Sequence, residues 1–399
     1  MDRAKTPPVG SYRPLAGVKV LDVGILIPAN QCSVKLAALG ADVVKVEAPG
    51  IGDRIRYIGG VGPRSENGHH QSQARGKRSI ALDLKDPKDQ EICLDLAAQA
   101  DVLIENFLPG ALERMGIDLE ALRRRRPELI VCSITGFGQT GPLASMPSHG
   151  LNMDALADSL NVDWRDGEPF LGRNFTSWGN EMGSTYACFA IAAALFERTR
   201  SGEGAWIDIS KWDTVVEAHR ADIALAYFTG DLGRPDPTAA PPPREFYNTY
   251  RSRDGRAVLL GALEKKFWTN FCRGVGREDL IDRHTGKELE FEAAPGATPL
   301  REELGAIFAT ADAAEWDRRF VEWDCPGSTV LHITDIIQHP HFAARDLAQG
   351  AFGEWPNVAN AIRWGHTGER AGLGLSPPPA IDEHREEVLR DWLGQRPEG

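Results

Sequence analysis

Short apolar runs alternate with stretches of helical spacing over the first third of the chain, and this alternation permits few folds. Residues 17–23 form a short β-branched run that is typical of a buried parallel strand. A helical stretch at 31–39 and a second run at 42–47 complete one βαβ unit. The pattern continues with strands expected at 79–84, 101–105 and 129–133 and helices at 87–99 and 118–125. Strands that alternate with helices predict an α/β fold with a parallel, doubly wound, Rossmann-like sheet.

The turn after the first run lacks the glycine fingerprint of dinucleotide-binding proteins. It reads GILIPA at residues 24–29 instead of GxGxxG, so NAD is not indicated. A Rossmann-like sheet without that turn predicts a fold and leaves the ligand open.

The middle of the chain contains a long apolar segment. Residues 183–197 are apolar nearly all round, as in a helix that is buried in a core or at an oligomer interface. A strand is expected next, at 206–210. This segment therefore predicts a helix with no face left to solvent.

A Pro- and Gly-rich stretch at 230–244 indicates a linker. Beyond it, runs at 247–251 and 256–260 flank Asp254-Gly255, which is a strong hairpin signal. Helices are expected at 264–275 and 300–321. We therefore expect a second, smaller α+β domain.

These elements divide the chain into three parts. We expect a large Rossmann-like domain over residues 1–228 and a small α+β domain over 229–329. The C-terminal segment, 330–399, has mixed helix and loop signals, and we expect it to return to the large domain.

Composition restricts the partners and the compartment. The formal net charge of −12 argues against binding to nucleic acid or to an anionic membrane, which needs a basic face. No stretch reaches the roughly 18 apolar residues that span a bilayer, and the leader MDRAKTPPVGSYRP lacks the apolar core of a signal peptide. The six cysteines are scattered without a CxxC pair, as is typical of reduced thiols. We therefore expect a cytoplasmic protein.

Other common chemistry is not indicated. The close histidine pairs, His69-His70 and His339 with His341, lack the carboxylate or cysteine spacing of a zinc site, so no metal is expected. The sequence contains neither a GxSxG elbow nor a P-loop.

Several segments together resemble the family III CoA-transferases, a family that includes formyl-CoA transferase, carnitine CoA-transferase and α-methylacyl-CoA racemase. They occur in the family's order along nearly the whole chain: PLAGVKVLDVG (14–24), LGADVVKVEAPGIGDRIR (39–56), RGKRSIALDLK (75–85), ADVLIENFLPGALERMGID (100–118), SITGFGQTGP (133–142), DGRAVLLGALEKKFW (254–268) and HPHFAAR (339–345). The resemblance implies an enzyme that acts on acyl-CoA and carboxylic acids, with coenzyme A entering as a substrate thioester. It also implies an interlocked homodimer in which each chain threads through a hole in the other.

The resemblance points to residues that would bind CoA, whose 3′-phosphate and pyrophosphate need cationic side chains and backbone N–H groups. Asn106, Phe107 and Arg114 match the segment that cradles the nucleotide in relatives. Phe107 would contact the adenine and Arg114 a phosphate. The other candidates are Arg56, the last residue of a GDxxR motif, and a basic cluster directly before a strand, which consists of Arg75, Lys77 and Arg78.

The transferases of this family use a single Asp as the nucleophile, in a Gly-Tyr-Asp motif after the GFGQxGP loop; it attacks the thioester to form a mixed anhydride. When the segment 147–154 is aligned without a gap, that position is Gly150, which cannot be a nucleophile. Asp154 lies four residues on, so on a helix it would share the face of Gly150 one turn later. Asp154 is therefore the best remaining candidate nucleophile.

The racemase branch of the family implies a different set of residues. There, two bases on opposite faces of the α-carbon exchange its proton. His149 matches the family's histidine, and Glu264 matches its glutamate in the segment GALE, residues 261–264. The third position falls on Asn180, which cannot accept a proton at neutral pH.

Three hypotheses follow. The first, which we favour because it dominates the family, is a transferase that moves CoA between an acyl-CoA and a carboxylic acid through a covalent intermediate at a carboxylate. The second is an epimerase, isomerase or lyase that uses His149 and Glu264 on the α-proton, and it predicts exchange of solvent deuterium into a lone acyl-CoA. The third is a protein that binds CoA without catalysis.

Overall fold

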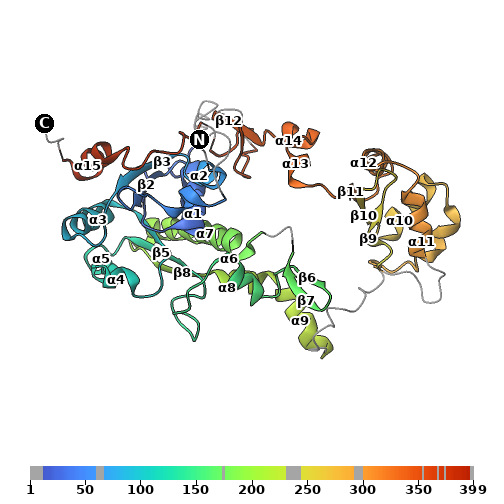
Figure 1. The fold of residues 1–399 in the computed structure, drawn as a ribbon, viewed down its shortest axis with the longest axis horizontal. Helices are drawn as coiled ribbons and strands as arrows, with labels where there is room; N and C mark the ends of the chain where they lie inside the picture. The colour runs from blue at the N-terminus through green and yellow to red at the C-terminus, as the bar shows by residue number, and fades with distance from the viewer. Residues whose placement is uncertain are drawn as a thin grey trace. The chain divides into compact units, whose positions relative to one another are not determined.

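The computed structural model describes residues 12–59, 67–172, 176–230, 244–291, 300–352, 355–365, 368–372 and 374–395. The chain forms two compact units: unit 1 is Met1–Gly233 with Ala344–Gly399, and unit 2 is Arg234–Ala343. Figure 1 shows the elements of each unit. Most of the linker expected at 230–244 lies outside the described residues.

A six-stranded parallel sheet is the centre of unit 1, which confirms the predicted α/β fold. Its strand order is β3-β2-β1-β4-β5-β8. The strands are β1 (Lys19–Asp22), β2 (Asp42–Glu47), β3 (Lys77–Ala81), β4 (Val102–Glu105), β5 (Ile130–Thr135) and β8 (Trp206–Ser210). The strand order reverses between β1 and β4, where Val20 pairs with Val43 on one side and Val102 on the other. Open sheets of this kind bind ligands at such a switch point, outside the carboxyl ends of the strands.

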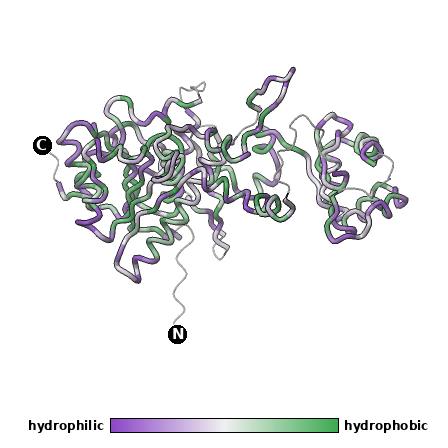
Figure 2. The backbone as a smooth tube through the Cα atoms, turned by 90° about the horizontal axis from the view of Figure 1, so that it is seen from below, coloured by the Kyte–Doolittle hydropathy of each residue, from purple (hydrophilic) through white to green (hydrophobic). Residues whose placement is uncertain are grey.

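Alternate residues of these strands enter two separate cores. Leu21, Val44 and Leu103 belong to one core, which α3 (Pro87–Gln99), α5 (Leu119–Arg125) and α15 (Arg385–Leu393) complete. The preceding residues of the same strands belong to a second core, completed by α1 (Leu26–Ala38) and α7 (Trp178–Ser201). This period of two, with helices on both faces, is why the strands are almost continuously apolar. Figure 2 shows hydrophobic segments, in green, running through unit 1.

Several shorter elements surround this sheet. They are η1 (Arg54–Tyr57), α2 (Gly68–Gln73), α4 (Ala111–Arg114), α6 (Gly150–Ala155), β6 (Val162–Arg165), β7 (Glu168–Leu171), α8 (Lys211–Ala218), α9 (Arg220–Thr229), β12 (Ala348–Phe352) and β13 (Trp355–Val358).

Helix α1 begins earlier than the sequence prediction of 31–39. It starts at Leu26 and includes Pro28 in its first turn. Proline is tolerated there because the first N–H groups of a helix have no intrahelical partner. The turn at the switch point is therefore shorter than expected.

Helix α7 packs on the core of unit 1 along one face, and the expected burial of its other faces at an oligomer interface stays a prediction. Gly183, Ala187 and Ile191, spaced one turn apart, face the core of unit 1. On other faces of the helix, however, Phe189 is 72% exposed and Phe196 is 66% exposed in the single chain.

Unit 2 is a small antiparallel sheet with helices. Strands β9 (Tyr247–Arg251) and β10 (Ala257–Gly261) form the predicted hairpin, and β11 (Gly327–Thr329) pairs with β10. The remaining elements are α10 (Lys265–Gly274), η2 (Glu278–Arg283), α11 (Leu300–Phe308), α12 (Ala313–Glu322), α13 (Ile333–Ile336) and α14 (Pro340–Ala344). Aromatic side chains, including Trp268 and Trp316, fill its core.

Two details of unit 2 differ from the sequence prediction. The single helix expected at 300–321 is two helices, because Asp312 has an extended backbone and its carboxylate pairs with Arg253 at 2.8 Å. Residues 330–343, which we had joined to the C-terminal segment, group with unit 2. An ion pair between Arg256 and Asp335 holds them there.

Candidate functional site

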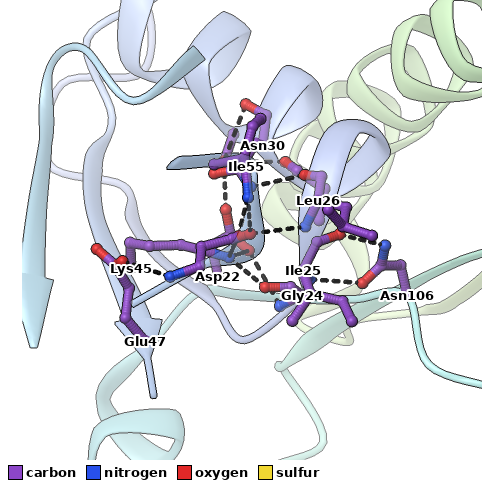
Figure 3. Close-up of polar contacts among 12 residues, drawn as sticks. Asp22, Gly24, Ile25, Leu26, Asn30, Lys45, Glu47, Ile55 and Asn106 are labelled. Carbon is purple, nitrogen blue, oxygen red and sulfur yellow. Dashed lines mark hydrogen bonds and ion pairs between the residues drawn. The ribbon is translucent and has the colours of Figure 1, made fainter. Parts of the chain in front are cut away.

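Asn106 and the backbone of Ile25 close the switch point between β1 and β4. Asn106 Oδ1 accepts a hydrogen bond from Ile25 N at 2.7 Å, and Asn106 Nδ2 donates to Ile25 O at 2.7 Å (Figure 3). Gly24 must be glycine here, since a Cβ atom would lie 2.3 Å from Ala29 Cβ and 2.8 Å from Asn106 Oδ1. Asn106, a predicted CoA contact, therefore uses its amide to shape this turn.

The residue after this turn has a strained backbone. Leu26 has a φ of 60°, which is rare for a bulky side chain. Asp53 holds it, because Asp53 Oδ1 accepts from Leu26 N at 3.0 Å. Asn30 Nδ2 also donates to Asp53 Oδ2 at 2.7 Å. Strain that the surroundings maintain is common at functional sites, and sequence reasoning missed Asp53, whose Asp-x-x-Arg spacing to Arg56 was the available signal.

Two buried lysines lie beneath the turn (Figure 3 labels Lys45). Lys45 Nζ lies 3.0 Å from Asp22 Oδ1 and 3.2 Å from Asp53 Oδ2. Burial disfavours the charged form of Lys45, but the two carboxylates stabilise the charged form by more, so the pKa of Lys45 is raised. Lys77 Nζ donates to Asn30 Oδ1 at 2.9 Å, and burial lowers the pKa of Lys77 to about 8. Lys77, expected in the phosphate site, is fully buried inside the fold.

Arg56 forms a bidentate ion pair. Its Nε lies 2.8 Å from Glu47 Oε2 and its Nη2 lies 2.7 Å from Glu47 Oε1. Burial favours the neutral form of Glu47, but the guanidinium of Arg56 outweighs it and lowers the pKa of that carboxyl. Arg56 Nη2 also donates to Pro379 O at 3.0 Å. A paired, charge-assisted fork of this kind has little capacity left for a phosphate.

The other two residues of the basic cluster, Arg78 and Arg75, also have partners within the protein. Arg78 Nη2 lies 2.6 Å from Asp42 Oδ2, and its Nη1 lies 3.0 Å from Asp391 Oδ2 of α15. Arg75 is buried, and its Nη2 donates to Val358 O at 3.3 Å. Its Nε has no partner among the described residues, and burial lowers the pKa of Arg75.

Phe107 and Arg114 follow β4 on the same edge. Phe107 is half-buried against the core of the α3 face, and its N donates to Glu105 Oε2 at 2.7 Å. Arg114 is exposed at the end of α4. Glu105 was missed by sequence reasoning, although it directly precedes the matched Asn-Phe pair. Burial raises the pKa of Glu105 to about 7.

Gly150, which the resemblance aligns with the family's nucleophile, has no room for a side chain. His149 precedes α6 as its exposed N-cap, and Gly150 is the first residue of that helix. A Cβ atom on Gly150 would lie 2.5 Å from Ser177 Oγ and 2.6 Å from Asn180 Nδ2. The first turn of α7 therefore occupies the space that an aspartate at this position would need.

Asp154 faces the same turn of α7 but is fully buried. Its Oδ1 accepts from Gly179 N at 2.8 Å, while its Oδ2 has no partner among the described residues. Burial raises the pKa of Asp154. Lys211, at the start of α8, donates to Asn180 Oδ1 at 3.4 Å, and burial lowers the pKa of Lys211 to about 8. The structure thus places Gly150, Asp154, Asn180 and Lys211 together, and Lys211 was not predicted.

Glu264 belongs to unit 2, whereas His149, Asp154 and Asn180 belong to unit 1. Glu264 is half-buried in the turn between β10 and α10, where it is the N-cap residue but its side chain does not cap the helix.

A metal-binding cluster and a membrane-spanning helix are both absent from the described ranges. No group of three or more His, Cys, Asp or Glu side chains could hold a metal ion there. No helix in that part of the chain is long and apolar enough to cross a membrane.

Comparisons with known proteins agree along the chain. The family model described as CoA-transferase family III matches residues 15–385. Succinyl-CoA:glutarate CoA-transferase of Mus musculus is 30% identical, covering 96% of this chain and 87% of the relative. Succinyl-CoA:mesaconate CoA-transferase of Haloarcula hispanica is 32% identical, covering 94% and 95%. Alpha-methylacyl-CoA racemase of Homo sapiens is 29% identical, covering 96% and 94%.

Solved structures agree with this result. A hypothetical protein from Mycobacterium tuberculosis has a TM-score of 0.79 at 26% identity, covering 93% of this chain and 98% of that chain. A CAIB/BAIF family protein from Brucella suis has a TM-score of 0.78 at 25% identity, covering 95% and 100%. With the predicted resemblance confirmed over nearly its whole length, this chain belongs to CoA-transferase family III and is an enzyme of CoA transfer.

Proposed function

We propose that this chain transfers CoA from succinyl-CoA, or a related acyl-CoA, to a small dicarboxylic acid. The observation that carries the proposal is the similarity over 94–96% of the chain to succinyl-CoA:glutarate and succinyl-CoA:mesaconate CoA-transferases. A third relative, named succinyl-CoA–D-citramalate CoA-transferase, has the same donor in its name. Among these three relatives the named donor is always succinyl-CoA, and the named acceptors are all small dicarboxylic acids.

Arg114 and Phe107 are the proposed CoA contacts. Arg114 is exposed at the end of α4, which follows the carboxyl end of β4 next to the switch point, and in this proposal its guanidinium binds a phosphate of CoA. Phe107 supplies the neighbouring apolar surface for the adenine. We assign Arg56 and Arg78 to supporting positions, because both are already paired with carboxylates. Asn106 supports the site by holding the turn at Ile25.

Asp154 is the proposed nucleophile in place of the missing aspartate at position 150. A carboxylate oxygen of Asp154 attacks the thioester carbonyl carbon, the C–S bond breaks and CoA thiolate leaves. The thiolate then attacks the Asp154 carbonyl carbon, releases the donor acid and leaves an Asp154–CoA thioester. The acceptor carboxylate resolves this thioester by the same two steps in reverse. Because Asp154 is fully buried in the free chain, this route requires the contact between α6 and α7 to open when substrate binds.

The alternative is chemistry at the α-carbon, in which His149 and Glu264 exchange the α-proton of an acyl-CoA. The exposure of His149 and the similarity to alpha-methylacyl-CoA racemase favour it. Transfer remains the proposal, because the racemase's aspartate position is Asn180 here.

The proposal includes a homodimer. A cytoplasmic location stays a prediction from the sequence. Helix α9 has no buried residue in the single chain, and Tyr227 and Phe228 on it are 75% and 91% exposed. Apolar surface of this kind marks an interaction site, and a second copy of the chain is the proposed occupant. Sedimentation of the purified protein at micromolar concentration tests this, and a monomer would contradict it.

The test of the reaction uses purified enzyme, succinyl-CoA and a panel of dicarboxylic acids in D2O, with CoA esters followed by mass spectrometry. Transfer predicts a new CoA ester only when an acceptor acid is present. Deuterium in the acyl-CoA without any acceptor would instead support the alternative and sink the transfer proposal. The absence of both across the panel would also count against it.

The nucleophile is tested by Asp154→Asn, with Asp158→Asn as the matched control. Asp158 is exposed at the end of the same segment and has a φ of 53°, which asparagine tolerates. We expect the first variant to lose both transfer and the mass increase of the intact protein on incubation with succinyl-CoA. The control variant should keep both. An Asp154→Asn enzyme with full activity would exclude Asp154 as the nucleophile.

A further inference from the structure

A buried histidine lies directly behind the turn that carries Glu264. His284 is 1% exposed, in the loop after η2. Its Nε2 lies 2.9 Å from Leu263 O, the carbonyl of the residue before Glu264. Glu290 N also donates to Leu263 O, at 3.0 Å. Two donors from one segment therefore hold the peptide that joins Leu263 to Glu264.

Glu290 lies beside the other ring nitrogen of the histidine. It is 5% exposed, and its Oε2 lies 3.1 Å from His284 Nδ1. The same carboxylate accepts from Thr285 N at 2.6 Å and from Thr285 Oγ1 at 2.8 Å. The carboxylate is thus fixed independently of the ring that it faces.

The contacts also assign one proton of the ring. A carbonyl oxygen can only accept, so His284 Nε2 must carry a hydrogen and donate it to Leu263 O. His284 Nδ1 then accepts a hydrogen bond from Gly286 N at 3.0 Å, and Glu290 Oε2 lies 3.1 Å from the same nitrogen. The ring of Phe246, at 5.2 Å between centroids, packs beside it. The orientation of His284 is therefore determined on both edges of the ring.

We propose that His284 and Glu290 are positioning residues, which fix the Leu263–Glu264 turn so that Glu264 is presented in one geometry. The inference rests on the alternative chemistry under the proposed function, in which Glu264 faces the substrate. A carboxylate–histidine pair behind a functional group orients that group in many sites, and small misplacement of a catalytic group costs rate more than binding.

The test compares His284→Leu with His284→Gln. Glutamine can place a donating nitrogen near the position of Nε2, whereas leucine fills space without a donor. We expect kcat of the leucine variant to fall roughly tenfold, as for the loss of one positioning hydrogen bond, while KM for the acyl-CoA stays within about twofold. Backbone hydrogen exchange in peptides covering 261–266 and 288–291 should become faster. The glutamine variant should restore both quantities most of the way.

Each alternative result decides the matter. Glu264→Gln, assayed in parallel, separates the two proposals: if it abolishes turnover while His284→Leu does not lower kcat, positioning is overturned and the role of Glu264 stands. If Glu264→Gln turns over normally, Glu264 leaves the proposed function and the positioning role falls with it. Unchanged hydrogen exchange in His284→Leu would overturn the structural claim itself. Should the leucine variant fail to fold, Glu290→Gln is made instead: it keeps the His284 side chain but removes the carboxylate beside it, and we expect kcat and hydrogen exchange to change in the same direction.

Discussion

Gly150 offers a quantitative test of why this chain lacks the family's aspartate. A Cβ atom there would lie 2.5 Å from Ser177 Oγ, 2.8 Å from Ser177 Cβ and 2.6 Å from Asn180 Nδ2. Neither neighbour moves freely, because Ser177 is the N-cap of α7 and Asn180 is buried. Forcing extra volume into such a place typically costs about 1–3 kcal/mol. Gly150→Ala should therefore lower the free energy of unfolding by about that amount.

The matched control is Gly68→Ala. Gly68, like Gly150, is the first residue of a short helix, but a Cβ atom on Gly68 would meet nothing within 4 Å. Replacement of glycine by alanine at an unstrained helical position normally stabilises by about 0.4–1 kcal/mol. Urea unfolding measured by circular dichroism should therefore give opposite signs for the two variants. Equal midpoints within error would refute the reasoning, since position 150 would then have room for a side chain.

The clash can also be assigned to a specific neighbour. Ser177→Gly removes both the Oγ and Cβ atoms, and glycine at an N-cap costs only a few tenths of a kcal/mol. In that background the cost of Gly150→Ala should shrink, which gives a favourable coupling energy in a double-mutant cycle. Gly150→Asp alone should be less stable than Gly150→Ala and should not gain activity.

Three further predictions concern charged residues in and around the sheet of unit 1. Burial raises the pKa of Glu105 from 4.5 to about 7. The stability linked to this protonation is therefore fully present below the unfolded pKa and is lost as pH rises through about 7. Glu105→Gln should therefore be more stable than the parent at pH 8.5, by about 2–4 kcal/mol, and no more stable at pH 4; a difference independent of pH in urea unfolding would contradict this. Arg114→Ala should raise KM for the acyl-CoA by roughly tenfold or more with kcat retained, while Arg124→Ala, on the exposed face of α5, should leave steady-state kinetics unchanged; equal effects would remove Arg114 from the CoA site. Lys77→Met should cost about 3–5 kcal/mol, because it leaves buried acceptors without their cation, whereas Lys88→Met at an exposed position should be neutral in thermal unfolding.

Local signals along the chain predict the sheet and most of its elements correctly. Strand β2 and helix α3 match the predicted ranges 42–47 and 87–99, because local signals are strong there. Asp86 caps α3 by accepting from Lys88 N at 2.8 Å, and Pro87 follows at the first helical position. Periodicity and caps act over a few residues, so they can be read directly from the chain.

Tertiary structure decided which of the predicted site residues are available. Arg78 pairs with Asp391, which lies 313 residues away, and Arg56 pairs with Glu47. Lys77 is buried under α1, where it donates to Asn30. A sequence shows which groups carry charge but not which opposite charge the fold brings within 3 Å of them. For the same reason only the packing of α7 against α6 reveals that position 150 has no room for the aspartate that it lacks.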